Sequence, residues 1–353
     1  MRHSILPPST VLPRFLVTFT VAVALLVIPS TAQATTAEPP YRAVTGMTYA
    51  ELPGKAGAID LYLPVDAGHG KPVPVVWVSG GCAWLCDDGN TIGPRYAEQF
   101  VPHGFAVAAV SVRSSGQAVF PAQLHDAKAS VRWLRAHADR YHLDKNRIAA
   151  MGDSSGAFAS TMLGVTGNDP ELEGDVGVTG PSSAVNAVVD LYTPTQFAEM
   201  DQHNLPGSCE LINEYGGGTN CHDDAKSPEG RLIGCRPSTC PDEVRAASPL
   251  TYVDTRTPPF LVVHGDADIN VPWQQSQLLF DAVAAHRVPA TFYRMHGMEH
   301  DMSFLDRTDG GFEHTVHTSS RNGEVVHMES APPLNWAEVI SWLDGALRVP
   351  TDG

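Results

Sequence analysis

A serine, an aspartate and a histidine that could form a nucleophilic triad occur in that order along the chain. Ser154 stands in AAMGDSSGAF, residues 149–158, which contains a G-x-S-x-G pattern. Asp266 and Asp268 follow in HGDAD, and His300 follows in GMEHD. A serine hydroxyl is a poor nucleophile at neutral pH, so it needs a histidine as base and a carboxylate that fixes the tautomer of that histidine. These residue types therefore indicate acyl transfer through a covalent intermediate.

The G-x-S-x-G pattern alone carries little weight, because the chain has 31 glycines. The serine becomes a candidate nucleophile if a buried strand precedes it and a helix follows it, since it then stands on a sharp turn at a strand end. The segment RIAAMG predicts that strand, and GAFASTMLG predicts the helix. Other apolar runs predict buried strands at 72–81, 105–113, 182–192, 258–268 and 290–297.

Helical segments alternate with these strands. The segment 121–142 starts with a proline, and its apolar positions recur at three and four residues, which is typical of a helix. Later helices are predicted at 271–287 and 334–348. Strands that alternate with helices favour a mostly parallel sheet covered by helices on both faces, so we expect an α/β fold. Functional groups of such sheets gather where strands end. Asp268 is the last residue of one predicted strand, and His300 follows another.

Two excursions interrupt this alternation within an expected catalytic domain at 43–349. The first, 195–247, is rich in Gly, Cys and Asp and has no strongly amphipathic helix, which favours a small polar cap over an apolar lid. The second, 301–333, contains Asn322-Gly323 between two alternating segments, a pattern typical of a β-hairpin.

The chain begins with the features of an export signal. Arg2 and Arg14 precede the apolar run 15–28, and the small residues AQA follow it. The run is shorter than the roughly 20 residues that a membrane-spanning helix needs, so we expect 1–34 to be a cleaved signal peptide. We therefore expect an extracellular or periplasmic protein, with a linker at 35–42 and no stable membrane insertion.

The charge of the chain bears on its partners. It carries 23 Lys and Arg against 39 Asp and Glu, a formal net charge of −16 at pH 7. Such a surface repels nucleic acid and anionic membranes, so neither is expected as a partner. No motif indicates a cofactor.

All six cysteines lie after the expected signal peptide. An even number of cysteines in an exported chain is typical of disulfides, and without a C-x-x-C pair we expect no metal site. His314, His317 and His327 could cluster in the second excursion, but a solvated hairpin face is the favoured interpretation. The expected disulfides are local: Cys82–Cys86, Cys209–Cys221 and Cys235–Cys240.

Four motifs in this order resemble the α/β-hydrolases of the esterase and lipase group, near the hormone-sensitive-lipase and feruloyl-esterase-like (BD-FAE-like) branch. They are WVSGGCAW, GDSSGA, SPLTYV followed by PPFLVVHGDADINVP, and GMEHD. The resemblance covers 45–345 outside the two excursions. It implies the α/β-hydrolase fold, with Ser154 as nucleophile, Asp268 as acid and His300 as base.

Three neighbouring residues compete for these roles. Asp266 fits a side chain that hydrogen-bonds its own loop. His296 still lies within the predicted strand 290–297 and is expected to pack there. His264 precedes a glycine at the end of its strand and is expected to be structural.

The resemblance also implies an oxyanion hole made by the backbone N–H groups of Gly81, Cys82 and Ser155. The sequence departs from the family pattern in this loop, because Ser79 stands in place of the usual His and Cys82 in place of the usual third Gly. A residue other than glycine restricts the loop backbone.

Trp84 and Tyr192 are candidates for the wall of the substrate pocket, although Trp84 could equally serve ordinary packing. We expect a secreted serine hydrolase of short-chain or aromatic acyl esters, either small molecules or esters linked to polysaccharide. A serine peptidase-like hydrolase and an acyltransferase are the alternatives, because both would use the same residues on the same fold.

Overall fold

The structure is a computed structural model and describes residues 40–68, 70–167, 169–307, 309, 311–328 and 331–348. The expected signal peptide, 1–34, lies outside the described residues, as does most of the expected linker. The last two linker residues, Tyr41 and Arg42, already belong to strand β1 (Tyr41–Thr48). Within the described ranges, none of the helices has the length and apolar character needed to cross a membrane.

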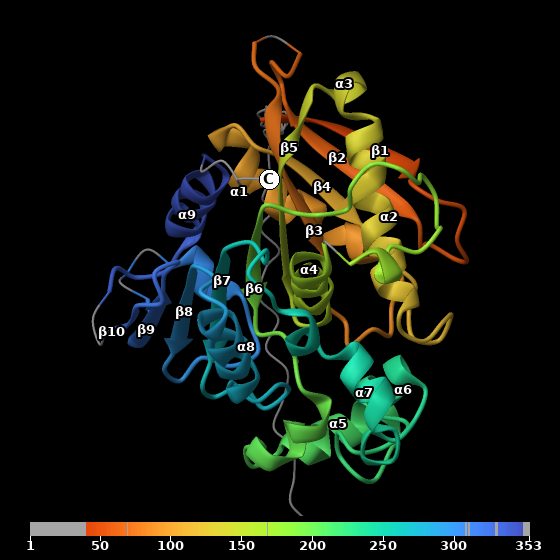
Figure 1. Cartoon of the computed structure of the whole chain (residues 1–353), viewed down its shortest axis with the longest axis vertical. Helices are drawn as coiled ribbons and strands as arrows, with labels where there is room; N and C mark the ends of the chain where they lie inside the picture. The colour runs from red at the N-terminus through yellow and green to blue at the C-terminus, as the bar shows by residue number, and fades with distance from the viewer. Residues whose placement is uncertain are drawn as a thin grey trace, which may run out of the picture. The chain divides into compact units, whose positions relative to one another are not determined.

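A ten-stranded mixed sheet forms the centre of the described chain, in the order β1-β2-β4-β3-β5-β6-β7-β8-β9-β10 (Figure 1). Neighbouring strands from β4 to β8 pair in parallel. The strands at both edges pair antiparallel. The predicted mostly parallel sheet is therefore confirmed. The remaining strands are β2 (Ala58–Pro64), β3 (Val73–Ser79), β4 (Ala106–Val110), β5 (Leu143–Asp153), β6 (Ala187–Leu191), β7 (Phe260–Gly265), β8 (Ala290–Met295), β9 (His314–Ser319) and β10 (Val325–Met328).

Helices cover both faces of the sheet, because its central strands are apolar on both sides. Val75 and Trp77 of β3 belong to the core on one face, and Val76 and Val78 belong to the core on the other. Helices α2, α4 and α8 pack on the first face, and α1 and α9 pack on the second. The helices of these layers and their short connections are η1 (Gly89–Ile92), α1 (Gly93–Phe100), η2 (Val101–His103), α2 (Ala122–Ala136), α3 (Ala138–Tyr141), α4 (Ser155–Thr166), η3 (Pro170–Leu172), η6 (Pro249–Tyr252), α8 (Gln274–Ala285), η7 (Ser303–Asp306) and α9 (Trp336–Arg348).

The first excursion, 195–247, folds into short helices joined by loops. Figure 1 shows α5, α6 and α7 together beyond one end of the sheet, the end toward which the arrow of β8 points. All three predicted cysteine pairs are present as disulfides: Cys82–Cys86, Cys209–Cys221 and Cys235–Cys240. The elements of this excursion are η4 (Phe197–His203), α5 (Ser208–Gly216), α6 (Pro228–Ile233), η5 (Pro237–Thr239) and α7 (Pro241–Ala247).

The second excursion contains the predicted hairpin. Its strands β9 and β10 pair antiparallel and extend the sheet beyond β8. Gly323 in the turn has a φ of 85°, which favours glycine. The turn prediction at Asn322-Gly323 is therefore confirmed.

Candidate active site

Ser154 occupies a sharp turn between the end of β5 and the start of α4. Its backbone has φ 53° and ψ −122°, a strained conformation for a residue other than glycine. Two backbone hydrogen bonds hold the turn. The Ser154 N–H donates to the Leu191 carbonyl at 2.9 Å, and the Phe158 N–H donates to the Ser154 carbonyl at 3.0 Å. The strand, turn and helix that the sequence predicts are all present.

The two glycines of the G-x-S-x-G pattern make this turn possible. A Cβ atom on Gly152 would overlap the backbone of Gly156, and a Cβ atom on Gly156 would overlap the carbonyl oxygen of Ser79. The helix after the serine therefore packs closely against both β5 and the end of β3. Any side chain at either position would push the serine out of place.

Asp268 and His300 come together at the ends of neighbouring parallel strands. Asp268 follows β7, His300 follows β8, and His300 Nδ1 lies 2.6 Å from Asp268 Oδ2. The other carboxylate oxygen, Oδ1, accepts the N–H groups of Asn270 at 2.8 Å and Val271 at 2.9 Å. With Nδ1 facing the carboxylate, His300 Nε2 is left for a substrate or a hydroxyl group.

The surroundings of Asp268 favour its charged form. Burial on its own would raise the pKa of this carboxyl group, but His300 and His264 outweigh burial and hold the pKa well below its usual range. His264 is fully buried, and its Nε2 lies 3.3 Å from Asp268 Oδ2. Its Nδ1 lies 2.7 Å from Ser276 Oγ. His264 is thus a structural residue, as expected, but it also contacts the acid, which the sequence did not indicate.

Asp266 and His296 form a second pair next to the first. His296 Nδ1 lies 2.8 Å from Asp266 Oδ2, and the Gly297 N–H donates to Asp266 Oδ1 at 2.7 Å. Asp266 therefore contacts the loop that follows β8, so the prediction that its side chain hydrogen-bonds its own loop was wrong. The prediction for His296 was wrong, because β8 ends at Met295 and the His296 side chain is 38% exposed in the loop that follows.

Tyr192 connects the turn at Ser154 with His300. It follows Leu191, the residue that accepts the Ser154 N–H, and its ring centroid lies 4.5 Å from that of His300. Tyr192 has a φ of 50° and is almost fully buried. Within the described residues, the Ser154 hydroxyl makes no direct hydrogen bond to His300. Catalytic hydrogen bonds of this kind often form only when substrate is bound.

The loop after β3 approaches the serine closely. A Cβ atom on Gly81 would lie 2.8 Å from the Cβ of Ser154. The Gly81 N–H donates to Asp153 Oδ1 at 3.3 Å, and the Cys82 N–H donates to Ser155 Oγ at 2.9 Å. The three proposed oxyanion donors therefore lie around the nucleophile, but two of them already have acceptors within the chain.

Trp84 is buried beneath this loop. Its ring meets Phe158 of α4 edge to face at 5.3 Å between centroids, and Phe197 of η4 at 5.8 Å. The residue thus joins the loop, the helix after the serine and the cap into one apolar cluster. This arrangement matches the packing role considered for Trp84 in the sequence.

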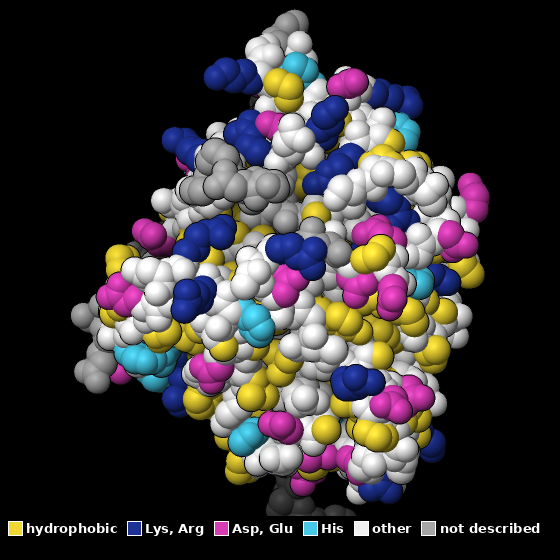
Figure 2. Space-filling model, viewed as in Figure 1, with side chains coloured by type: hydrophobic (Ala, Val, Ile, Leu, Met, Phe, Trp, Pro, Cys, Tyr) yellow, Lys and Arg dark blue, Asp and Glu magenta, His cyan; other side chains and the backbone are white. Residues whose placement is uncertain are grey.

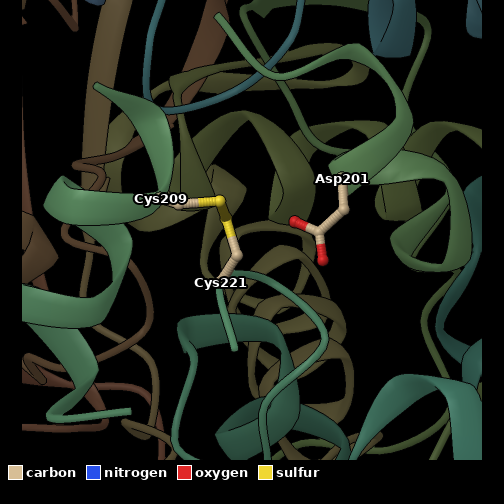
Figure 3. Close-up of side chains that lie close together, drawn as sticks. All are labelled: Asp201, Cys209 and Cys221. Atoms are coloured by element: carbon tan, nitrogen blue, oxygen red, sulfur yellow. A yellow bond between two sulfur atoms is a disulfide. The ribbon is translucent and has the colours of Figure 1, made fainter. Parts of the chain in front are cut away.

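Asp201 of the cap lies close to two cysteine sulfur atoms. Figure 3 shows Asp201 beside Cys209 and Cys221, whose sulfur atoms are bonded to each other. A disulfide lacks the thiolate that binds metals. Asp201 instead accepts the N–H groups of His222 at 3.1 Å and Asp223 at 3.0 Å. It therefore stabilises a turn of the cap.

The sheet order, the serine turn and the Asp–His pair at the strand ends define an α/β-hydrolase. The chain belongs to the BD-FAE family, whose family model matches residues 59–283. The resemblance inferred from the four sequence motifs is therefore confirmed.

Curated relatives are esterases by name. Esterase LipC of Mycobacterium tuberculosis is 25% identical over 237 residues, which is 67% of this chain and 55% of that protein. The isoprenylcysteine alpha-carbonyl methylesterase ICME of Arabidopsis thaliana is 28% identical over 261 residues, 72% of this chain and 56% of that protein. The chain thus spans about half the length of the curated relatives it matches.

Solved structures share the fold. A truncated carbohydrate esterase from gut microbiota superimposes with a TM-score of 0.68 at 26% identity, covering 89% of this chain and 99% of that one. A propionate-bound esterase, Est2 of Thermogutta terrifontis, superimposes with a TM-score of 0.55 at 21% identity, covering 77% of this chain and 88% of that one.

Proposed function

We propose that this protein is a secreted serine hydrolase that cleaves carboxylic esters through an acyl-enzyme intermediate. The observation that carries the proposal is the 2.6 Å hydrogen bond between His300 and Asp268, on loops that meet the Ser154 turn through Tyr192. Esterases among the curated relatives support the same reaction. The proposal that the protein is secreted rests on the signal-like segment 1–34.

In the proposed reaction, Ser154 Oγ attacks the carbonyl carbon of the ester while His300 Nε2 takes the hydroxyl proton. Asp268 keeps Nδ1 protonated and stabilises the imidazolium ion that forms. The imidazolium then gives its proton to the departing alcohol, so the C–O bond breaks and an acyl-serine remains. A water molecule repeats the attack with the same proton transfers, which releases the acid and restores Ser154.

Backbone donors would stabilise the oxyanion. The first N–H groups of an α-helix have no partner inside the helix, so the Ser155 N–H at the start of α4 is free to donate. The Cys82 N–H would release the Ser155 hydroxyl and donate its hydrogen bond to the oxyanion instead. The Gly81 N–H would likewise change its acceptor from Asp153 to the oxyanion. The disulfide Cys82–Cys86 limits the movement of the loop during this exchange.

We propose short-chain or aromatic acyl groups as substrates, on small alcohols or on polysaccharide. The cap supports this choice because its helices are short and two disulfides lie within it. An apolar lid that could meet a lipid surface would need a longer amphipathic helix. The similarity to a carbohydrate esterase at 26% identity supports a saccharide-linked substrate.

A panel of soluble esters tests the proposal. The wild-type protein should hydrolyse 4-nitrophenyl acetate and methyl ferulate, whereas Ser154→Ala and His300→Ala should each lose about 10⁴-fold or more in kcat. The His296→Ala variant is the matched control and should keep most of the activity. Faster turnover of peptide anilides, preferred transfer to an added alcohol, or a preference for emulsified long-chain triglycerides would each contradict the proposed substrate class.

A further inference from the structure

A cleft of about 470 Å³ lies beside the proposed oxyanion loop. Its walls come from the end of β1, from the loop 49–57 and from η1, the short helix that follows the Cys82–Cys86 disulfide. Strand β2 begins beside the end of β4, and β4 runs parallel to β3. The cleft is therefore at the same edge of the sheet as Ser154.

Hydrogen bonds and a disulfide tie the cleft to the oxyanion loop. The Gly80 N–H donates to the carbonyl of Gly89, the first residue of η1, at 3.1 Å. The Cα atoms of Cys82 and Cys86 lie 6.1 Å apart, and Asp88 of the cleft follows Cys86 by two residues. Because consecutive Cα atoms are about 3.8 Å apart, the Cα of Asp88 lies at most about 14 Å from that of Cys82. A short chain joined to an ester at the nucleophile therefore reaches the cleft.

A buried carboxylate fixes two walls of the cleft relative to each other. Asp60 Oδ1 accepts the Gly46 N–H of β1 at 2.8 Å, and Asp60 Oδ2 accepts Asn90 Nδ2 of η1 at 2.6 Å. The Asn90 N–H also donates to Ser111 Oγ at 3.1 Å. The cleft is thus formed before any ligand binds, which is usual for ligand sites.

The lining of the cleft offers a hydrogen-bond donor next to an acceptor. Lys55 Nζ lies 3.0 Å from Asp88 Oδ2, and these side chains are 69% and 34% exposed. The ammonium group can donate to one hydroxyl group of a ligand while the carboxylate accepts from the hydroxyl group beside it. Thr48, Glu51 and Thr91 add exposed polar side chains to the lining. Pairs of neighbouring hydroxyl groups are characteristic of saccharides.

The charges favour an uncharged ligand. Among the described lining residues, the charged ones are Glu51, Lys55 and Asp88, so the lining has no surplus of positive charge for a polyanion. The whole chain carries a formal net charge of −16, which also repels polyanions. Figure 2 shows Lys and Arg side chains lying among Asp and Glu side chains on the face in view. A neutral saccharide therefore fits better than an acidic one.

We propose that this cleft binds sugar units of a neutral polysaccharide substrate, next to the sugar that carries the ester. The inference rests on the proposed function, because it requires the ester carbonyl to lie at Ser154. Lys55 and Asp88 bind hydroxyl groups of the chain and do not touch the reacting ester. Such binding is equal in the ground state and the transition state, so it lowers KM and leaves kcat nearly constant.

The dependence of ester hydrolysis on sugar chain length tests the cleft. We compare acetylated xylose with acetylated xylotetraose, and acetylated mannose with acetylated mannotetraose. For the wild-type protein, kcat/KM should rise at least about tenfold with chain length in one series or both, mainly through KM, which is the size expected of one hydrogen bond to a charged group. Lys55→Met and Asp88→Ala should each lose most of this gain.

Lys71→Met is the matched control. Lys71 is also exposed, but it precedes β3 and so lies at the opposite edge of the sheet. This variant should keep the full gain with chain length. No gain in either series for the wild-type protein, or an undiminished gain in both cleft variants, would overturn the proposal. Because each variant is judged by the ratio of its long to its short substrate, a general loss of activity does not imitate the effect.

Calorimetric binding separates this inference from the proposed function. Full-length Ser154→Ala should bind the acetylated tetrasaccharide of the series that shows the gain, and the added Lys55→Met substitution should weaken that binding at least about tenfold. Equal binding by the single and double variants would contradict a role of the cleft even if the wild-type protein is an esterase. A wild-type protein that hydrolyses neither these esters nor 4-nitrophenyl acetate would instead contradict the proposed function.

Discussion

Asp268 and Asp266 lie two residues apart, yet they have different partners. Asp268 pairs with His300 and two backbone N–H groups, whereas Asp266 pairs with His296 and Gly297. Both carboxylates hold a histidine, so the distinction depends on which histidine lies beside Tyr192 and the serine turn. The structure places His300 there.

The two aspartates should therefore differ in mutant kinetics. Asp268→Asn should lower kcat by about 10⁴-fold, because the amide can donate to the imidazole and hold the wrong tautomer. Asp266→Asn should lower thermal stability and leave kcat within about tenfold of the wild type. Ester hydrolysis and thermal unfolding of both purified variants provide the comparison. Equal losses of kcat in two folded variants would remove the case for Asp268 as the acid.

The Ser155 hydroxyl competes with the proposed oxyanion for the Cys82 N–H. Ser155→Ala removes that acceptor while it keeps the Ser155 backbone donor. We expect kcat to rise by up to about tenfold, since a typical hydrogen bond contributes about 0.5–1.5 kcal/mol. Steady-state kinetics with 4-nitrophenyl acetate measures the change. A fall of more than tenfold would mean that the hydroxyl holds the loop in its active position.

The sequence predicts which residues lie at the candidate site, but it does not reveal all of their contacts. The sharp turn at Ser154 could be predicted because its motif lies between an apolar strand and a helix. The contact of His264 with Asp268 depends on how the loop after β7 folds back, which residue spacing does not reveal. His296 was misplaced because the predicted strand continued past Met295, and strand ends depend on pairing that a single segment does not specify.

Among the elements, long apolar segments were predicted well and boundaries less well. The predicted helix 121–142 is divided into α2 and α3, because His137 has φ −108° and ψ 10°, outside the helical range. The order β2-β4-β3-β5 in the sheet does not follow the chain, so sequence alone could not give it. It arises from long-range pairing, such as that of Ile59 with Val110.

A buried acid in β6 makes the free energy of unfolding of the protein depend on pH. Asp190 is fully buried next to the serine turn, with Thr161 Oγ1 and the Thr193 N–H as partners. Burial raises the pKa of Asp190 to about 7. The folded protein thus retains this proton between about pH 4 and about pH 7 while the unfolded chain loses it, so the group lowers stability as pH rises through that window.

Asp190→Asn should remove this pH dependence, because the amide resembles the protonated acid in shape and donors. Relative to the wild type, the variant should gain roughly 3 kcal/mol in free energy of unfolding between pH 5 and pH 8. Each pH unit between the pKa values of the unfolded and folded states contributes about 1.4 kcal/mol. Urea unfolding across this range measures the difference. A constant difference between the two proteins would show that Asp190 is ionised in the folded state at pH 5.

At the scale of the whole molecule, disulfides support the loop beside the serine and the cap. Cys82–Cys86 and Cys235–Cys240 enclose loops of similar length, with sequence separations of 4 and 5. The first lies in the proposed oxyanion loop and the second lies in the cap. Their removal should therefore cost similar stability, about 2 kcal/mol in the chain-entropy model, but different activity.

Double serine variants compare the two disulfides directly. Replacement of Cys82 and Cys86 should lower kcat for small esters at least about tenfold, because the Cys82 N–H loses its fixed position. Replacement of Cys235 and Cys240 should leave kcat for the same esters nearly unchanged. Kinetics and unfolding midpoints of both variants are the measurements. Equal kcat values in the two variants would show that the Cys82–Cys86 disulfide does not contribute to catalysis.

Covalent labelling with a fluorophosphonate tests the central claim most directly, because such probes react with activated serines. After labelling of the wild-type protein, peptide mapping by mass spectrometry should place the modification on Ser154 and on no other serine. The Ser154→Ala variant, with unchanged circular dichroism, should remain unlabelled. A label on another residue of the wild-type protein, or full labelling of the folded variant, would contradict the assignment of Ser154 as the nucleophile.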